Sequence, residues 1–236
     1  MKRIAVGKKT TDEGEKPFWI SFSDMMTTLM VLFLLVMSVA LLAVTKNVSD
    51  MEQKKADREQ EINQLLTQME TVAQHHPGVR INRTRHVIDF GDRVRFDSGS
   101  SRLSDKQAKY LRAFLPEILA LTKQNPGQRW LKRVVVEGFA DQRGDYLLNL
   151  NLSLQRSQRV LCVLLEKADA DEKPLGTDEL EQVRRLFLVG GYSFNSAKKS
   201  LEESRRVELR LEYFDVDEIR PDDRDIPHGD IGFCRI

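Results

Sequence analysis

The chain has 236 residues, 41% of them hydrophobic, which suits one domain of roughly 100–150 residues with further segments attached. It carries 37 Lys and Arg against 36 Asp and Glu. This near balance of charge favours neither a nucleic-acid-binding protein nor an acidic tether.

An apolar run lies close to the N-terminus. Residues 25–44 are 20 consecutive residues without charge, Pro or Gly, and an α-helix needs about 20 such residues to cross ~30 Å of hydrocarbon. A cleaved signal peptide is the alternative, but its apolar region is typically about 7–15 residues long. The sequence therefore predicts a transmembrane helix over residues 18–44. Residues 1–17 carry a slight excess of basic side chains, which favours a cytoplasmic N-terminus and an exported C-terminal part.

Asp24 is a charged residue within this predicted helix. An isolated Asp at the centre of a bilayer costs about 2.5–3.5 kcal/mol on insertion scales, and intramembrane ionisable residues commonly mark ion pathways. Helical spacing places Ser21, Thr27 and Thr28 on the face of Asp24. Because desolvation disfavours the charged form, a carboxylate beside an aqueous path is suited to binding and releasing a proton. Na⁺ is a second possibility, since the three hydroxyls would supply supporting oxygen ligands.

A simpler interpretation places Asp24 at the edge of the membrane. Phe18 and Trp19 resemble the aromatic belt of a membrane–water interface, and they lie only five or six residues away. An Asp at that depth would be hydrated by headgroups and would need no role in transport. Position alone leaves both interpretations open.

Residues 45–78 are rich in helix formers, which predicts an amphipathic connector helix. Its apolar positions form one stripe that needs a partner, and a second copy of the chain or the membrane surface would serve. Such a helix suits a plug or a dimeric stalk. We interpret His75 and His76 as a solvated helix end, because no further metal-ligand pattern accompanies them. The stripe consists of Ile62, Leu65, Leu66, Met69, Val72 and Ala73.

Residues 79–214 alternate strand-like and helix-like segments, which predicts an α/β domain with helices packed on a small mixed sheet. Strands are expected at 85–90, 131–139, 184–192 and 205–214. Helices are expected after a capping box at Ser104 and Gln107 and over 151–168. Residues 95–104 and 169–180 are expected to be loops. The alternation of apolar and charged residues along 205–214 predicts a sheet with one solvated face. Residues 215–236 are expected to form an acidic C-terminal tail.

The chain has two cysteines, Cys162 and Cys234. Cys162 lies within the apolar stretch VLCVLL, where a small buried thiol is expected. Cys234 lies in the tail, and the pair does not indicate a disulfide framework.

The predicted span carries a family resemblance. The stretch FWISFSDMMTTLMVLFLLVMSVALL resembles the single span of bacterial stator B subunits, the MotB family, at Trp19, Ser23, Asp24 and Thr27. The resemblance implies that Asp24 carries the ion, beside a ring of MotA-like (ZorA-like) membrane subunits that turns about a homodimer of B subunits. It also implies a single-pass protein of the bacterial inner membrane that needs no cofactor and transports H⁺ or Na⁺.

Asp141 and Arg156 form a second constellation. The strand expected at 131–139 leads into a glycine-bounded loop that bears Asp141, and the following helix bears Arg156. A carboxylate and a guanidinium at one site suit a zwitterion, because Asp accepts from an ammonium and Arg donates to a carboxylate. A structural salt bridge between the two residues is the alternative.

The same stretch resembles the OmpA-like peptidoglycan-binding domain. RFDSGSSRL and SRRVELRLE match further elements of that family, with Ser204 in place of Asn and Phe139 in place of His. The resemblance implies that Asp141 and Arg156 hold the diaminopimelate of the peptidoglycan stem, while Asn149 and Leu152 shape the pocket. The matching positions are Gly138, Ala140, Asp141, Asn149, Leu152, Ser153 and Arg156.

An ion-binding span joined to a wall-binding domain indicates a stator B subunit rather than an enzyme, and the sequence contains no Ser/His/Asp, Cys/His or phosphate-loop pattern. The compact connector and acidic tail resemble the B subunits of Zorya anti-phage defence systems. That resemblance implies indirect coupling to cytoplasmic defence effectors, with no direct nucleic-acid binding. A flagellar-type MotB stator subunit and a purely structural envelope anchor without ion chemistry are the alternatives.

Overall fold

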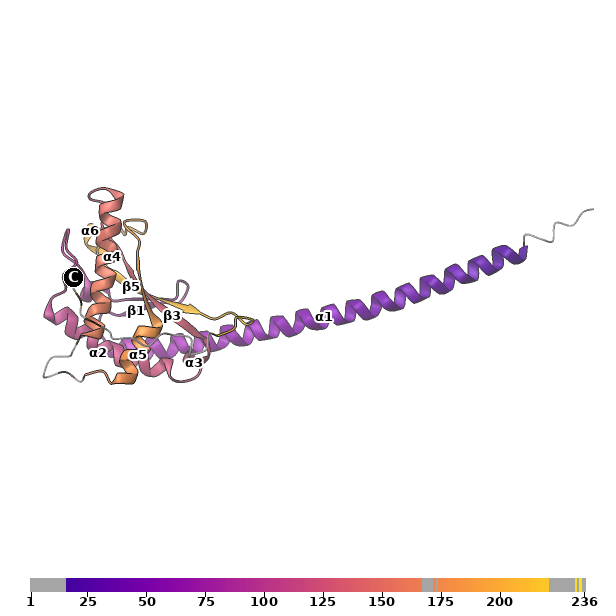
Figure 1. Cartoon of the computed structure of the whole chain (residues 1–236), viewed down its shortest axis with the longest axis horizontal. Helices are drawn as coiled ribbons and strands as arrows, with labels where there is room; N and C mark the ends of the chain where they lie inside the picture. The colour runs from indigo at the N-terminus through magenta and orange to yellow at the C-terminus, as the bar shows by residue number, and fades with distance from the viewer. Residues whose placement is uncertain (1–15, 167–171, 173, 221–231, 233, 235–236) are drawn as a thin grey trace, which may run out of the picture. The chain divides into compact units, whose positions relative to one another are not determined.

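The computed structural model of the protein describes residues 16–166, 172, 174–220, 232 and 234 (Figure 1). Most of the predicted N-terminus and most of the predicted acidic tail lie outside these residues. The chain divides into two compact units, Met1–Lys54 and Lys55–Ile236.

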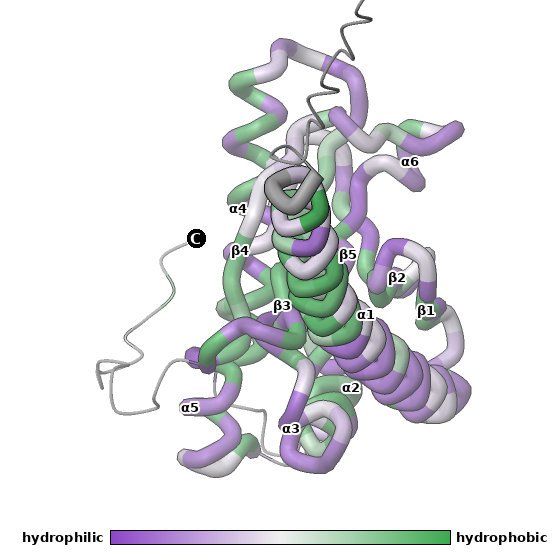
Figure 2. The backbone as a smooth tube through the Cα atoms, turned by 90° about the vertical axis from the view of Figure 1, so that its right-hand side faces the viewer, coloured by the Kyte–Doolittle hydropathy of each residue, from purple (hydrophilic) through white to green (hydrophobic). Residues whose placement is uncertain are grey.

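The first unit contains the beginning of helix α1 (Lys16–His75). Its side chains from Trp19 to Asp50 are exposed, and Figure 2 shows hydrophobic residues along this part of the tube, followed by a hydrophilic stretch. Within the described residues, α1 is the one helix long and apolar enough to cross a membrane by length and composition. The predicted helix over 18–44 is therefore present.

In the described part of the second unit, five strands form one sheet (Figure 1). They are β1 (Arg80–Asn82), β2 (Val87–Asp89), β3 (Leu131–Gly138), β4 (Phe187–Gly191) and β5 (Val207–Tyr213), in the order β1-β2-β5-β3-β4. β3 and β4 are parallel and the other neighbours are antiparallel. The helices are η1 (Gly91–Val94), α2 (Asp105–Thr122), α3 (Gly127–Trp130), α4 (Tyr146–Leu165), α5 (Thr177–Leu186) and α6 (Leu201–Ser204). The predicted class, a long apolar helix followed by helices on a small mixed sheet, is confirmed.

The local predictions agree in part with these elements. The capping box is present, because the Ser104 side chain accepts from the backbone of Gln107 and the Gln107 side chain accepts from the backbone of Ser104. Helix α4 begins earlier than expected, since the Asp145 carboxylate accepts the Leu148 N–H at 2.8 Å and caps the helix there. Five elements were not expected, namely β1, η1, α3, α5 and α6. Strand β1 is only three residues long, and α5 occupies the end of the expected loop and the start of the expected strand at 184–192.

The apolar stripe of the connector finds its partner within its own unit. Five of its six residues are buried, and they belong to the same hydrophobic cluster as residues of α2, α4 and the sheet. Polar contacts support this packing: Glu61 accepts from Trp130 Nε1 at 2.6 Å, and Arg58 Nε donates to the Phe214 carbonyl at 2.7 Å. The expectation that the stripe needs a second chain or a membrane is therefore wrong for residues 62–73.

The end of α1 is only partly solvated. His75 is exposed, whereas the His76 ring bonds to Glu117 Oε1 at 2.8 Å and lies edge-on to Phe114. The expected solvated helix end is thus wrong for His76, because α2 packs against it.

The second face of the sheet carries buried carboxylates, so the expectation of a solvated face is wrong at Glu208, although Arg210 and Glu212 on the same face are half-exposed. Glu137 and Glu208 are 0% and 1% exposed. Glu208 accepts from Arg206 Nε at 2.6 Å and from Arg85 Nη2 at 2.8 Å, and Glu137 accepts from Arg210 Nε at 2.5 Å. Charged residues can alternate along a strand and still be buried when arginines on neighbouring elements neutralise them.

Cys162 and Cys234 form a disulfide, which corrects the expectation of a free buried thiol. The bond joins α4 to a position 72 residues further along the chain. It fixes Cys234 against the domain, although sequence spacing offers no sign of this pairing.

Candidate functional site

Asp24 lies on an exposed face of α1, in the first unit. The hydroxyls of Thr27 and Thr28 donate to the backbone carbonyls of Ser23 and Asp24, each at 2.8 Å. Each hydroxyl oxygen keeps its lone pairs free to accept or to ligate a cation. Ser21 lies three residues before Asp24 on the same helix. Among the described residues, no salt bridge partner approaches the Asp24 carboxylate.

The second candidate site is the loop of residues 139–145, between β3 and α4. Gly138 ends β3 where α4 crosses closely, and a Cβ at this position would lie 1.9 Å from the Ser153 carbonyl oxygen. A glycine is therefore required for this approach. The close packing brings the loop against the N-terminal half of α4.

Asp141 is 6% exposed and accepts hydrogen bonds from two arginines. Its Oδ1 accepts the backbone N–H of Arg143 at 3.0 Å, and its Oδ2 accepts from Arg143 Nη2 at 2.7 Å and from Arg205 Nη1 at 3.1 Å. The hydrogen bond from Arg143 is the main cause that lowers the pKa of Asp141 to about 2. The carboxylate is therefore ionised under ordinary conditions.

Arg156 is fully buried on α4 and donates to three backbone carbonyls. Its Nε bonds to Ser100 at 2.9 Å, its Nη1 to Phe139 at 2.8 Å and its Nη2 to Asp97 at 3.0 Å. Burial lowers the pKa of Arg156 to about 10, and the nearby charge of Asp141 opposes this shift. The guanidinium holds the loop of residues 97–100 and the loop of Phe139 together, and it keeps its positive charge at neutral pH.

The structure brings Asp141 and Arg156 to the same loop without a hydrogen-bonded ion pair between them. Asn149 is also buried there, and its Nδ2 braces the loop by donating to the carbonyls of Arg143 at 2.8 Å and Asp145 at 3.1 Å. Leu152 is half-buried on the same helix. The alternative, a structural salt bridge between Asp141 and Arg156, is therefore wrong.

Sequence reasoning missed Arg143 and Arg205, the two cations that do pair with Asp141. A signal for each was present. Arg143 lies two residues after Asp141 in the glycine-bounded loop, and Arg205 is the first arginine of SRRVELRLE. Arg205 was matched only as a position in a pattern and Arg143 was not matched at all, because spacing gives no sign of which arginine turns toward the carboxylate.

The ion pairs of Asp141 predict an acid-dependent loss of stability. Its pKa is about 2 when folded and about 3.9 in an unfolded chain, so the unfolded state binds the extra proton. The stabilisation is complete above about pH 4 and is lost as the pH falls toward about 2. We expect the urea midpoint of the full chain in detergent to fall less steeply over this range in Asp141→Asn than in the wild type. Equal slopes would contradict the assignment.

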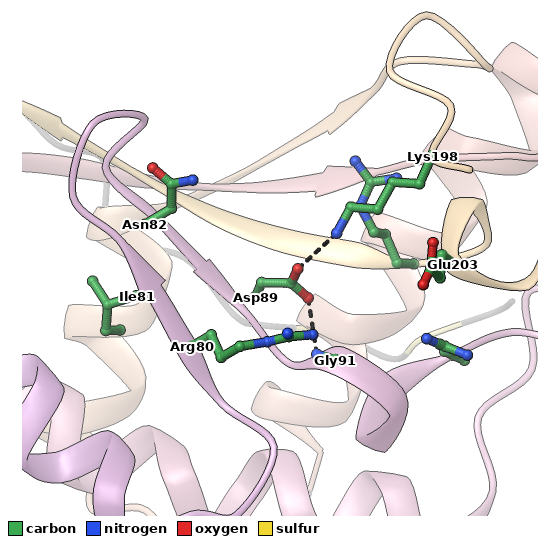
Figure 3. Close-up of a pocket in the computed structure, with 9 residues that line it drawn as sticks. Arg80, Ile81, Asn82, Asp89, Gly91, Lys198 and Glu203 are labelled. Carbon is green, nitrogen blue, oxygen red and sulfur yellow. Dashed lines mark hydrogen bonds and ion pairs between the residues drawn. The ribbon is translucent and has the colours of Figure 1, made fainter. Parts of the chain in front are cut away.

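A separate cavity of about 420 Å³ borders β1 and β2 and is lined largely by charged residues (Figure 3). Asp89 lies between Lys198 Nζ, at 2.7 Å, and the backbone N–H of Gly91, at 2.8 Å. Arg206, on the wall of this cavity, is paired with Glu208. Asp89 and Arg206 are thus both paired, and none of the residues that line this cavity belongs to the Asp141 site.

Two comparisons of sequence relate the chain to known proteins. Residues 2–53 match the family described as membrane MotB of the proton-channel complex MotA/MotB. Over 232 residues the chain is 42% identical to the Zorya protein ZorB of Escherichia coli O139:H28 (strain E24377A / ETEC), covering 95% of this chain and 92% of the relative.

Solved structures show weaker likenesses. The periplasmic domain of Helicobacter pylori MotB is 15% identical with a TM-score of 0.42, covering 62% of this chain and 86% of that one. The OmpA-like domain of FopA1 from Francisella tularensis is 18% identical with a TM-score of 0.34, covering 58% and 82%. At these values the likenesses do not bear on function. The sequence relative, however, spans both the apolar helix and the α/β domain, and the chain therefore belongs to the ZorB family and is a MotB-type B subunit with a single membrane span.

Proposed function

We propose that this protein is the B subunit of an ion-driven inner-membrane motor of the Zorya anti-phage type. In this proposal Asp24 carries a proton, or Na⁺, along a path completed by a ring of MotA-like (ZorA-like) subunits, with Ser21, Thr27 and Thr28 as supporting hydroxyls. The observation that carries the proposal is the Asp24 carboxylate itself, on an apolar helix with no described salt bridge partner. Two copies of the chain would supply a carboxylate each.

The α/β domain serves as the anchor to peptidoglycan in this proposal. Asp141 and Arg156 lie at one loop, both keep their charges at neutral pH, and together they suit the ammonium and carboxylate of the diaminopimelate stem. Asn149 braces the loop and Leu152 contributes a half-buried apolar surface. A domain anchored to the cell wall holds the B subunits still while the ring turns. In this proposal the motor then signals to cytoplasmic defence effectors.

Sedimentation with purified peptidoglycan sacculi tests the anchor. The full chain in detergent should pellet with sacculi, and Asp141→Ala should reduce the bound fraction to background, because the ligand ammonium loses its counter-charge. Glu212→Ala is a matched control, since it removes a half-exposed carboxylate on β5 away from the loop. Undiminished pelleting of Asp141→Ala would contradict this role.

The disulfide supports an exported domain, with the N-terminus in the cytoplasm and residues 55–236 in the periplasm. Disulfides persist in oxidising compartments and are rare in the cytoplasm. We expect a membrane-impermeant maleimide, applied to cells with a permeabilised outer membrane, to label the protein only after reduction. Cys162→Ser should be labelled without reductant, because it frees Cys234. If the wild type were instead labelled without reductant, and only after lysis of the inner membrane, the α/β domain would lie in the cytoplasm.

The flagellar-type motor and the purely structural anchor are the two other candidates. The identity to the Zorya relative across both units favours the defence motor over the flagellar one. The structural anchor predicts that Asp24 is dispensable, which a single substitution tests directly.

A further inference from the structure

The Asp141 carboxylate is already saturated by side chains and backbone of its own domain. Oδ1 receives the backbone N–H and the Nε of Arg143, at 3.0 and 3.3 Å, and Oδ2 receives Arg143 Nη2 and Arg205 Nη1, at 2.7 and 3.1 Å. An ionised carboxylate has about four lone-pair sites. A ligand ammonium can therefore reach Asp141 only by displacing one of these donors.

Arg205 is firmly held in place. Its side chain is 14% exposed, and its Nε donates to the Phe96 carbonyl at 2.9 Å while its own carbonyl accepts the Phe96 N–H at 3.0 Å. Moving its guanidinium would break contacts that join the start of β5 to the loop after η1. Arg205 is therefore a fixed part of the site.

Arg143 is the side chain that can leave. It is 54% exposed, and apart from Asp141 its guanidinium bonds only to the Ser98 hydroxyl, at 2.8 Å, among the contacts described. Gly144, with a φ of 90°, follows it directly, so the chain turns there without side-chain obstruction. The Arg143 side chain thus contacts Asp141 from the solvent-exposed side of the site.

We propose that Arg143 is a resident competitor for the ligand ammonium: its guanidinium occupies the place of the ligand's cation on Asp141, and wall binding requires it to swing into solvent. This inference rests on the proposed wall-anchoring function. Because an arginine guanidinium does not deprotonate in proteins, only a competing cation opens the site, and a change of pH within the physiological range does not. The described structure is the self-occupied form.

Removing the competitor should tighten binding. We expect Arg143→Gln to lower the sacculus concentration needed for half-maximal pelleting of the full chain by about two- to fivefold, the range for a half-exposed ion pair. Arg143→Lys keeps the charge and should remain close to the wild type. Arg83→Gln is the matched control, because it removes another exposed arginine that is paired with a carboxylate, that of Glu70, on the β1–β2 turn. It should leave the half-saturation concentration unchanged.

Three results would overturn the inference. Weaker binding of sacculi by Arg143→Gln would show that Arg143 contacts the ligand. Unchanged binding would show that Arg143 does not limit access of the ligand ammonium to Asp141. A tightening of equal size in Arg83→Gln would assign the effect to net charge instead. Failure of the proposed wall-anchoring function gives a different result from failure of this inference. In that case the wild type would not pellet with sacculi, or Asp141→Ala would pellet as well as the wild type. Unchanged Trp130 fluorescence in each variant confirms that the domain is folded.

Discussion

Asp24→Asn should abolish phage protection in cells that carry the complete defence system, while the amount of protein in the membrane stays unchanged. Asn has nearly the shape of Asp and fits the same helix, but it cannot bind and release a proton and carries no charge to hold Na⁺. The substitution also removes a cost of about 2.5–3.5 kcal/mol for an isolated charge in the bilayer, so membrane insertion should not suffer. Efficiency of plating measures protection, and immunoblotting of membranes measures assembly.

Asp50→Asn is the matched control for this experiment. Asp50 is an exposed acidic residue of the same helix, beyond the apolar run, so its loss should leave protection intact. Full protection by Asp24→Asn would refute the ion-carrying role and leave the structural anchor as the better function. Loss of protection by both variants would point to a general effect of charge on α1.

Glu208→Ala should destabilise the α/β domain by about 3–5 kcal/mol, the usual effect of removing one partner of a buried ion pair. Glu208 is 1% exposed and Arg206 is 3% exposed, so the substitution leaves a buried guanidinium without its carboxylate. Arg206 also stacks on Phe139, with its Cζ 4.1 Å from the ring centroid, and its carbonyl accepts the Phe139 N–H at 3.0 Å. The loss should therefore extend to the loop that holds Asp141.

Urea unfolding of the full chain in detergent, followed by the fluorescence of buried Trp130, measures this effect. Glu212→Ala provides the comparison on the same strand, because its partner Arg133 is half-exposed and such pairs contribute only about 0.2–1 kcal/mol. Equal losses in the two variants would show that the buried layer under the sheet contributes no more than a surface pair.

Features that depend on local chemistry could be predicted from the sequence. A run of 20 residues without charge, Pro or Gly specifies a helix of membrane length wherever it lies. The capping box at Ser104 depends on residues three apart, and the strand at 131–139 depends on its own β-branched composition. Asp24 stood out because a carboxylate is costly in an apolar helix, whereas Asp141 and Arg156 were assigned a ligand-binding role through a family resemblance.

Contacts between groups that are distant in the sequence could be read only from the fold. The stripe of Ile62 and its neighbours was visible, but only the fold shows that it packs on its own domain. Glu208 had the alternating position of a solvated residue, and it is buried because Arg206 and Arg85 neutralise it. Cys162 pairs with Cys234 across 72 residues, and Asp141 pairs with Arg143 and Arg205 instead of Arg156. Charge pairing and disulfide formation depend on proximity in space, and residue order does not encode that proximity locally.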